Sequence, residues 1–393
     1  MTTAHPAILG GPPAFPDGLP FVRPPAPPLE RVVARLAPSY ERGVLTNGPL
    51  VREFEQQAAE WLGVPHAVAV SNCTAGLMLA CQALRPAGPV VLPSFTFSAS
   101  AHALAWNGLD VRFAECDPAS FQLDLTDAAA RLDGAGGLLA THIFGAPAPA
   151  GQAEALALGA GIPLIFDAAH AFGARLAGRP VGGFGDAEIF SLSPTKVVVA
   201  GEGGVVATRH DDLARHVRLG RDYGNPGDYN TEFAGLNARM SELHAAIALE
   251  SLDALGAHLD QREAIANRYR DGLGHIAGVD PQAVPTADRS TWKDFTVRVD
   301  AERAGIERDL LVQGLRAEGV DTRCYFFPPV HQHDAYRRQR VDLPVTDRTA
   351  ASVISLPIWR DLPLSSVDAV VDLIGGLTGR GDEVRAVSSA STG

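Results

Sequence analysis

The sequence predicts an α/β protein in which a mostly parallel sheet lies between helices, with a smaller α+β lobe toward the C-terminus. Three observations support this fold class. The chain has 393 residues, more than the roughly 250–300 at which single hydrophobic cores stop growing, so two lobes are expected. Short apolar runs alternate with amphipathic segments, which is typical of strands joined by helices. Residues 164–166 are apolar at consecutive positions, as in strands that helices cover on both faces.

Residues 1–29 are expected to form an N-terminal arm and not a domain. Prolines crowd this segment between Pro12 and Pro27. Because proline fixes φ and has no amide donor, we expect the arm to run extended across the surface.

Residues 30–255 are expected to form a large domain that holds the sheet. Its strand candidates are short apolar runs, several of them separated by amphipathic segments such as residues 125–132 and 152–158. The runs cover residues 66–70, 89–92, 111–116, 137–143, 163–167, 187–192 and 203–208.

Residues 256–380 are expected to form a small C-terminal domain. A long helical pattern covers residues 241–273, and we place the domain boundary inside it. Beyond it, strand-like residues 295–299 and 324–327 flank a helical pattern near 306–315. Residues 381–393 are expected to be a flexible tail, because its last residues are small and polar with little to bury.

Composition argues against several classes of partner. The net charge of −12 and the pI near 5.4 oppose nucleic-acid binding, which needs basic surfaces, although one phosphate group can still bind locally. The four cysteines contain no C-x-x-C pair, so neither a zinc site nor a disulfide framework is expected. No apolar run reaches the roughly 18 residues of a membrane span, and the first residues do not resemble a secretory signal. We expect a cytoplasmic protein that binds neither nucleic acid nor membranes.

Lys196 is the first candidate for chemistry. It follows the apolar run 187–192 and precedes the glycine-rich turn at 201–204, so its stem is expected near buried backbone. Burial lowers the pKa of a lysine, and the neutral amine attacks carbonyl groups. A surface lysine at a strand end would explain the same pattern, so the motif alone does not decide.

Asp167 and Ser191 end two consecutive strand candidates, and His170 follows three residues after Asp167. In an open parallel sheet, ligands bind beyond the carboxyl ends of the strands, so both side chains would face one crevice. Alternatively, Asp167 caps the next helix and His170 lies on that helix's surface.

Three weaker motifs complete the set. Residues 71–76 lie between a strand candidate and a helical pattern, where a helix start binds an anion or is simply capped by Ser or Thr. Phe97 follows a strand candidate and would stack on a planar cofactor or belong to the core. The pair His331 and His333 has the spacing of metal ligands, but no third ligand is evident and loop histidines are the commoner explanation.

Together and in this order, the segments resemble the DegT/DnrJ/StrS sugar aminotransferases, fold-type I enzymes that use pyridoxal 5′-phosphate (PLP). The similarity covers about residues 46–331. It implies a mostly parallel sheet of the seven-stranded type and a catalytic pair. Lys196 would hold PLP as a Schiff base and then move protons, while Asp167 would keep the pyridine nitrogen protonated so that PLP acts as an electron sink.

The resemblance also implies the cofactor contacts. Thr74, Ala75 and Ser191 would bind the phosphate, His170 would contact the 3′-oxygen, and Phe97 would stack on the ring. These positions fit the motifs described above.

Asn237 is similar to the family's asparagine that reaches the phosphate of the neighbouring subunit, which implies a homodimer with shared active sites. Tyr325 and His331 are assigned to the substrate. The chain departs from the commoner family pattern at Cys73, where glycine is usual, at Ser193, where a histidine often precedes the lysine, and at His170, where glutamine is frequent. None of these changes removes a required chemical group.

The function implied by the resemblance is amino transfer from glutamate to a nucleotide-linked keto-sugar, with a dTDP-4-keto-6-deoxy-hexose as the favoured acceptor. The alternatives are a 3-keto-sugar, a cyclitol or an aminohydroxybenzoate-type acceptor. Related dehydratases carry histidine in place of the lysine, so Lys196 argues against that activity. A non-catalytic PLP-binding regulator is disfavoured by the acidic charge and by the absence of a DNA-binding appendage.

Overall fold

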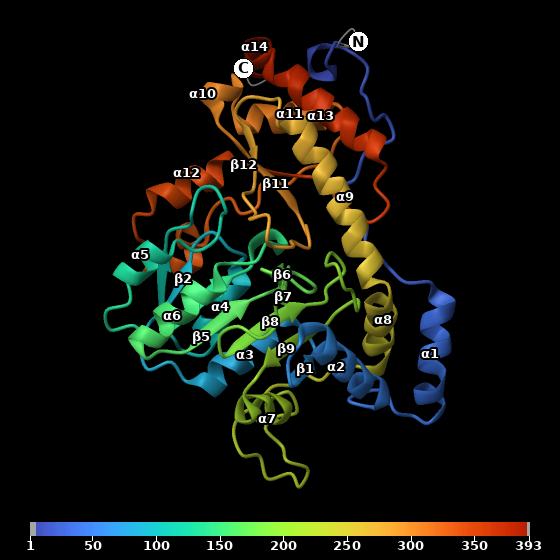
Figure 1. Cartoon of the computed structure of the whole chain (residues 1–393), viewed down its shortest axis with the longest axis vertical. Coiled ribbons are helices and arrows are strands. Elements are labelled where there is room, and N and C mark those ends of the chain that lie inside the picture. Colours follow the sequence, from blue (N-terminus) through green and yellow to red (C-terminus); the bar gives the residue numbers. More distant parts are fainter. Residues whose placement is uncertain (1–4, 391–393) are drawn as a thin grey trace.

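The computed structural model describes residues 5–390, which fold into a large lobe and a smaller one (Figure 1). The large lobe is built on a seven-stranded sheet in the order β1-β9-β8-β5-β4-β2-β3. Strand β9 is antiparallel to both of its neighbours, and the other ladders are parallel. The strands are β1 (His66–Val70), β2 (Val90–Pro93), β3 (Val111–Ala114), β4 (Gly137–Thr141), β5 (Leu164–Asp167), β8 (Ala187–Ser191) and β9 (Gly204–Thr208). The predicted α/β class, with a mostly parallel sheet, is confirmed.

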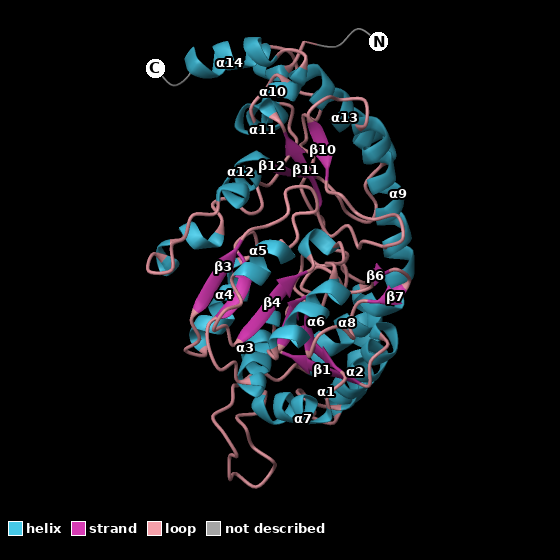
Figure 2. Cartoon of the chain, turned by 60° about the vertical axis from the view of Figure 1, so that its left-hand side comes forward, coloured by secondary structure: helices cyan, strands magenta, loops and turns pink. Residues whose placement is uncertain are grey.

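Helices cover both faces of this sheet (Figure 2). One face packs against α1, α2, α5, α6 and α8, and the other against α3, α4 and α7. Within β5, Leu164 and Phe166 belong to the first core and Ile165 to the second, which explains the consecutive apolar residues. The helices are α1 (Leu29–Glu41), α2 (Pro49–Leu62), α3 (Cys73–Leu84), α4 (Ser98–Trp106), α5 (Leu125–Ala130), α6 (Ala150–Ala160), α7 (Asp211–Gly220) and α8 (Glu242–Asp253).

The small lobe contains an antiparallel sheet in the order β10-β11-β12. Its core is formed by the sheet with α9, α11, α13 and α14. The predicted long helix over 241–273 is two helices, α8 and α9, which meet at Ala254 (Figure 1). The elements are β10 (Val279–Pro281), β11 (Phe295–Val299), β12 (Val353–Leu356), α9 (Leu255–Leu273), α10 (Ala301–Ala304), α11 (Arg308–Ala317), α12 (Pro344–Ser352), α13 (Leu364–Thr378) and α14 (Gly381–Ala390).

Two predictions for the C-terminal part are wrong. Residues 324–327 form a turn and not a strand, and the small sheet takes its other two strands from β10 and β12. The flexible tail predicted from residue 381 is helix α14 as far as the description extends. Val384 is fully buried in the small-lobe core, and the Arg385 guanidinium donates to both carboxylate oxygens of Glu307 at 3.0 Å. Val384 and this ion pair, with a hydrogen bond from the Ser388 hydroxyl to Gln313 of α11, attach the segment to the small lobe.

The N-terminal arm lies on the small lobe (Figure 1). The buried carboxylate of Glu318 accepts hydrogen bonds from the amides of Ala7 at 2.7 Å and Ala14 at 2.9 Å. The buried side chains of Leu19 and Phe21 lie farther along the arm, where the Leu19 amide donates to the Gly319 carbonyl at 2.8 Å. The arm is therefore attached to the fold and also contains a short 3₁₀ helix, η1 (Ala7–Leu9).

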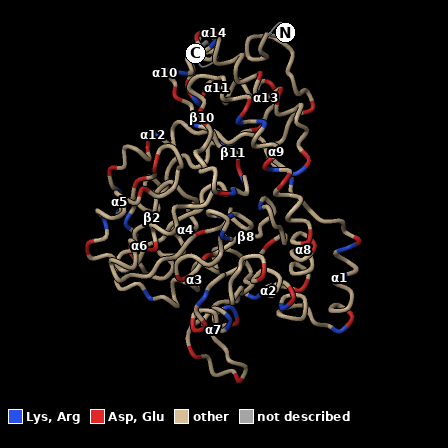
Figure 3. Tube along the Cα trace, viewed as in Figure 1, with Lys and Arg blue, Asp and Glu red and all other residues tan. Residues whose placement is uncertain are grey.

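Smaller elements are the two-stranded ribbon of β6 (Arg175–Leu176) and β7 (Arg179–Pro180) and the 3₁₀ helices η2 (Ile143–Gly145), η3 (Val330–Gln332) and η4 (Asp334–Tyr336). Acidic and basic positions are interspersed over both lobes in the described part of the chain (Figure 3). Within residues 5–390, no helix is long and apolar enough to cross a membrane.

Candidate active site

A cavity of about 310 Å³ lies where β5 and β8 end, beside the start of α3. Ligands of open α/β sheets bind at this edge. The small lobe contributes to its wall through residues 293–294 and 325–326. The lining residues are Asn72, Cys73, Thr74, Phe97, Ala99, Asp167, Ala169, His170, Ser191, Ser193, Thr195, Lys196, Glu202, Lys293, Asp294, Tyr325 and Phe326.

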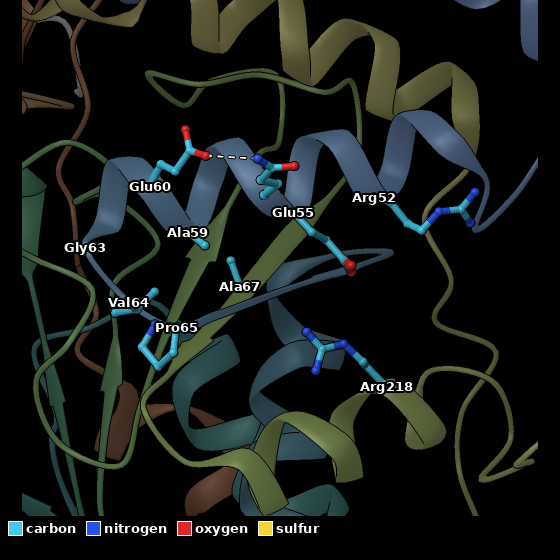
Figure 4. Close-up of a pocket in the computed structure, with 10 residues that line it drawn as sticks. Arg52, Glu55, Ala59, Glu60, Gly63, Val64, Pro65, Ala67 and Arg218 are labelled. Carbon is cyan, nitrogen blue, oxygen red and sulfur yellow. Dashed lines mark hydrogen bonds between the residues drawn. The ribbon is translucent and has the colours of Figure 1, made fainter.

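A second hollow, of about 620 Å³, lies between α2 and Arg218 of α7 (Figure 4). It contains none of the predicted site residues. Arg52, Glu60 and Arg218 on its rim are exposed, and Glu60 is already paired with the Gln56 amide at 3.1 Å. The cavity at the strand ends is the one that combines buried charges with the predicted residues.

Lys196 lies in the cavity after the turn that follows β8, where its backbone amide donates to the Ser193 carbonyl at 3.0 Å. Burial, followed by the positive charge of Lys293, lowers the pKa of the Lys196 amine to about 8. A substantial fraction of the amine is therefore neutral near physiological pH, which suits a nucleophile or a proton acceptor.

Asp167 is the last residue of β5, and its carboxylate is held from two sides. The Ser100 hydroxyl of α4 donates to Oδ2 at 2.6 Å, and the Ala169 amide donates to Oδ1 at 3.1 Å. Ser100 itself lies 3.0 Å from the Thr96 hydroxyl. These contacts orient a nearly buried anion toward the cavity, where it can stabilise a positive charge on a ligand. Residues 168–174 form turns and no helix directly follows β5, so the alternative that Asp167 caps a helix is wrong.

His170 lines the cavity as a neutral imidazole. Burial, with the charges of Lys196 and Lys293, lowers its pKa well below the ordinary value. A neutral histidine has one ring N–H donor and one acceptor nitrogen, so it can hydrogen-bond a ligand oxygen without adding charge. Its ring is nearly parallel to that of Phe144, with centroids 6.4 Å apart.

The start of α3 and the end of β8 form the polar end of the cavity, where Thr74 and Ser191 supply hydroxyls. Asn72 caps the helix by accepting from the Ala75 amide at 2.8 Å. Ala75 does not line the cavity, and its amide is already used by the cap, so the phosphate contact at Ala75 stays a prediction. The earlier first-turn amides have no carbonyl partner within a helix and favour an anion.

Of the remaining predicted residues, some line the cavity and others do not. Phe97 and Tyr325 line the cavity, and the Phe97 ring lies 6.3 Å from that of Phe326. Asn237 is exposed and outside the cavity of its own chain, and its side-chain oxygen accepts from Arg239 at 3.1 Å.

His331 does not line the cavity, in contrast to its prediction as a substrate residue. Its Nδ1 lies 2.7 Å from the Ser94 hydroxyl and its Nε2 lies 3.2 Å from Asp347. The preceding residue, Val330, packs into the core between the sheet and α3, α4 and α7, which keeps His331 buried away from the cavity.

Several cavity residues were not predicted. Ser100 escaped notice because a serine inside a helix has no distinctive pattern. Lys293 and Asp294 are nearly fully buried, and the Lys293 ammonium donates to Asp294 Oδ1 at 2.7 Å. Adjacent opposite charges directly before the apolar strand β11 were the available signal for this pair.

Comparison with known proteins agrees with this geometry. The model of the DegT/DnrJ/EryC1/StrS aminotransferase family matches residues 30–375. The chain belongs to this family. Its enzymes are PLP-dependent sugar aminotransferases, and the chain is accordingly a PLP-dependent sugar aminotransferase.

Three relatives illustrate the similarity. The solved structure of DesI in the presence of its TDP-sugar product is 40% identical, with a TM-score of 0.91, and the match covers 97% of this chain and 98% of that one. A UDP-N-acetyl-3-dehydro-alpha-D-glucosamine 3-aminotransferase of Acidithiobacillus ferrooxidans is 30% identical over 89% of this chain and 94% of its own. The spore coat polysaccharide biosynthesis protein SpsC of Bacillus subtilis is 30% identical over 87% of this chain and 93% of its own.

The cavity has the donor set that PLP requires. It offers an amine for the cofactor's aldehyde, a carboxylate for its ring nitrogen, hydroxyls beside a helix start for its phosphate and an aromatic ring for its face. The residues are, in that order, Lys196, Asp167, Thr74 with Ser191, and Phe97.

Proposed function

We propose that the enzyme moves an amino group from glutamate to a dTDP-linked 4-keto-6-deoxy-hexose, giving a 4-amino sugar for secondary-metabolite or polysaccharide biosynthesis. The observation that carries the proposal is Lys196, an amine with a lowered pKa that shares one cavity with the oriented carboxylate of Asp167. The similarity to DesI, which was solved with a TDP-sugar product, supports the choice of a dTDP-linked acceptor.

PLP, when bound, supplies an electron sink for the electron pair that is left when Cα of the donor loses its proton. Lys196 would anchor the cofactor and, once the donor has displaced it, would accept the Cα proton with its neutral amine. Asp167 would hold a proton on the pyridine nitrogen, since Ser100 and the Ala169 amide fix its direction. Thr74 and Ser191 would bind the phosphate.

A 3-keto-sugar is the second candidate acceptor. The relative from Acidithiobacillus ferrooxidans is a 3-aminotransferase for a UDP-linked sugar, and it is 30% identical to this chain.

We also infer that the enzyme is a homodimer in the cytoplasm. Asn237 is exposed and unused by its own cavity, which leaves it available for the phosphate of a second subunit. All four cysteines are free thiols, as is usual in reducing compartments.

A coupled assay tests the acceptor and the donor together. Purified enzyme with PLP is offered dTDP- and UDP-linked 3-keto and 4-keto sugars, each with glutamate or glutamine, and the amino sugar is identified by mass spectrometry and NMR. We expect the fastest turnover with glutamate and the dTDP-4-keto-6-deoxy-hexose. Faster turnover with a 3-keto sugar would replace the first candidate by the second, and turnover of no nucleotide sugar would overturn both.

A further inference from the structure

Lys293 is the second ammonium group of the active-site cavity. Of the 33 lysine and arginine residues in the chain, only Lys196 and Lys293 are lysines, and both line this cavity. An ammonium is a compact charge with three rotatable donors, whereas guanidinium is a planar fork. All the remaining residues of this set are arginines, so both lysines of the chain lie at the active site. The proposed reaction uses only one of them.

The Lys293 side chain is held in a fixed place. Its backbone directly precedes β11, and the buried guanidinium of Arg262 in α9 donates to the carbonyls of Trp292 at 2.7 Å and Lys293 at 3.4 Å. The Lys293 ammonium donates to Asp294 Oδ1 at 2.7 Å and lies 6.0 Å from the centre of the Tyr325 ring. An ammonium held in this way loses little freedom when it binds a ligand.

The charges around Lys293 favour an anion. Lys293, Asp294 and Arg262 are all nearly fully buried. Burial lowers the pKa of Arg262 to about 10, which leaves it protonated at neutral pH. Asp294 therefore lies near two cations, Arg262 and Lys293. The wall carries two more carboxylates: Asp167, which is assigned to the cofactor's ring nitrogen, and Glu202. Because a buried ammonium that shares its carboxylate partner is not fully compensated, an anionic ligand beside Lys293 would stabilise it.

We propose that Lys293 binds the α-carboxylate of the amino-acid donor, an assignment that rests on the transamination inferred above. The α-carboxylate is attached to the carbon that carries the transferred nitrogen, so the cation that binds it must lie in the cavity of Lys196. Among the described lining residues the cationic side chains are Lys196 and Lys293, and His170 is neutral. Because Lys196 is committed to the cofactor, Lys293 remains for the donor.

The other anion of the reaction, the diphosphate of a sugar nucleotide, fits this position less well. In a 4-keto sugar the reacting carbon and the carbon that carries the diphosphate lie on opposite sides of the ring. The diphosphate would therefore be a sugar's width away from the reacting nitrogen, whereas Lys293 is close enough to Lys196 to lower the pKa of its amine.

The test measures donor binding without turnover. PLP-loaded enzyme is titrated with α-methylglutamate, which lacks the Cα proton, and the dissociation constant is read from the cofactor's absorbance. We expect Lys293→Gln to raise this constant by about 10- to 100-fold, because one charge-assisted hydrogen bond is lost. 4-Aminobutyrate, which is glutamate without its α-carboxylate, should bind the variant and the natural enzyme equally.

Two further variants test whether weaker binding comes from the lost charge or from misfolding. The double substitution Lys293→Gln with Asp294→Asn removes both charges, so no lone buried carboxylate remains, and it should weaken α-methylglutamate equally. Lys293→Arg keeps the charge and should weaken it less. An unchanged constant for α-methylglutamate, an equal loss for 4-aminobutyrate, or a rise only in the KM for the keto-sugar would each overturn the assignment. Since no acceptor is present in the titration, donor binding by an enzyme that aminates no nucleotide sugar would refute only the proposed acceptor.

Discussion

At the scale of single residues, Lys196 is the group on which the chemistry depends. It should be the site of covalent attachment, so borohydride reduction of the PLP-loaded enzyme should fix the cofactor's mass to Lys196. Lys196→Ala should remove both this adduct and measurable transamination while the protein stays folded. The other lysine of the described cavity lining, Lys293, is paired with Asp294 and would not replace it. Full turnover by this variant, or an adduct on Lys293 in the natural protein, would contradict the assignment.

The lowered pKa of Lys196 is itself measurable. In cofactor-free protein labelled with ¹³C at lysine Cε, the two lysines give two signals, and we expect that of Lys196 to titrate near pH 8. Burial disfavours the charged form, so the amine is protonated below this pH and neutral above it, and its reactivity toward amine reagents should rise through pH 8. Lys293→Gln removes one neighbouring positive charge and should raise the midpoint. Titration near the ordinary value of 10.5 would contradict this environment.

Asp167 and Ser100 should differ in the size of their effect. Asp167→Asn should retain PLP but slow both half-reactions by more than about 100-fold, because the ring nitrogen loses its charged partner. Ser100→Ala removes one hydrogen bond to Asp167 and should slow them by about 2- to 10-fold. Stopped-flow absorbance measures both, and Ser100→Thr, which keeps the hydroxyl, is the matched control. Equal rates for Asp167→Asn and the natural enzyme would contradict a role of Asp167 in the chemistry and leave it a structural one.

The sequence predicted that Lys196, Asp167 and Ser191 lie together, because each is a polar residue at or after the end of a strand, and all three line the cavity. It did not predict positions that depend on contacts with other parts of the fold. Ala75 and His331 do not line the cavity: the Ala75 amide donates to the capping Asn72, and His331 contacts Ser94 and Asp347. Contacts of this kind depend on the tertiary arrangement, which a single sequence does not contain.

At the scale of elements, helix α14 shows how one buried side chain orders a polar segment. Val384→Ala should lower the free energy of unfolding by about 1–3 kcal/mol, because a fully buried side chain is shortened in a packed core. Val387 on the same helix is 41% exposed, so Val387→Ala should change it by less than about 0.5 kcal/mol. Urea unfolding of the two variants decides between an ordered helix and a tail, since a tail would make both changes negligible.

The strands of the large sheet were predictable because each is a short run that helices bury on both faces. Every predicted run contains its strand except 89–92, which ends one residue before β2 does. The small sheet was harder to predict. Its strand β10 has three residues, and β12 follows directly from helix α12, so neither stands out as a separate apolar run. The turn at 324–327 has a strand-like composition, but its aromatic side chains line the cavity or pack between the lobes.

At the scale of the whole molecule, the proposed homodimer has a direct test. Lys196→Ala and Asn237→Ala subunits are each expected to have little activity, but mixed dimers should recover up to about one intact site in two, because each site would combine residues of both chains. Light scattering gives the mass, and activity after co-expression with two affinity tags gives the complementation. A monomeric mass, or mixed dimers without recovered activity, would contradict the shared site.

The division into two lobes was predicted from chain length and from the long helical pattern over 241–273, inside which the boundary was placed. The path of the N-terminal arm did not follow, because proline content predicts an extended course but not the surface on which it lies. The arm lies on that surface because the buried carboxylate of Glu318 accepts hydrogen bonds from two of its amides and because Leu19 and Phe21 are buried there.

The attachment of the arm brings the first and last described elements together on the small lobe, with η1 packed against α11 and α14. Four covalent crossings join the lobes: the segment before Leu29, the junction at Ala254, and the segments before and after η3 and η4, since Val330 and Tyr336 belong to the core of the large lobe. A single proteolytic cut at any one crossing leaves the lobes tethered by the others.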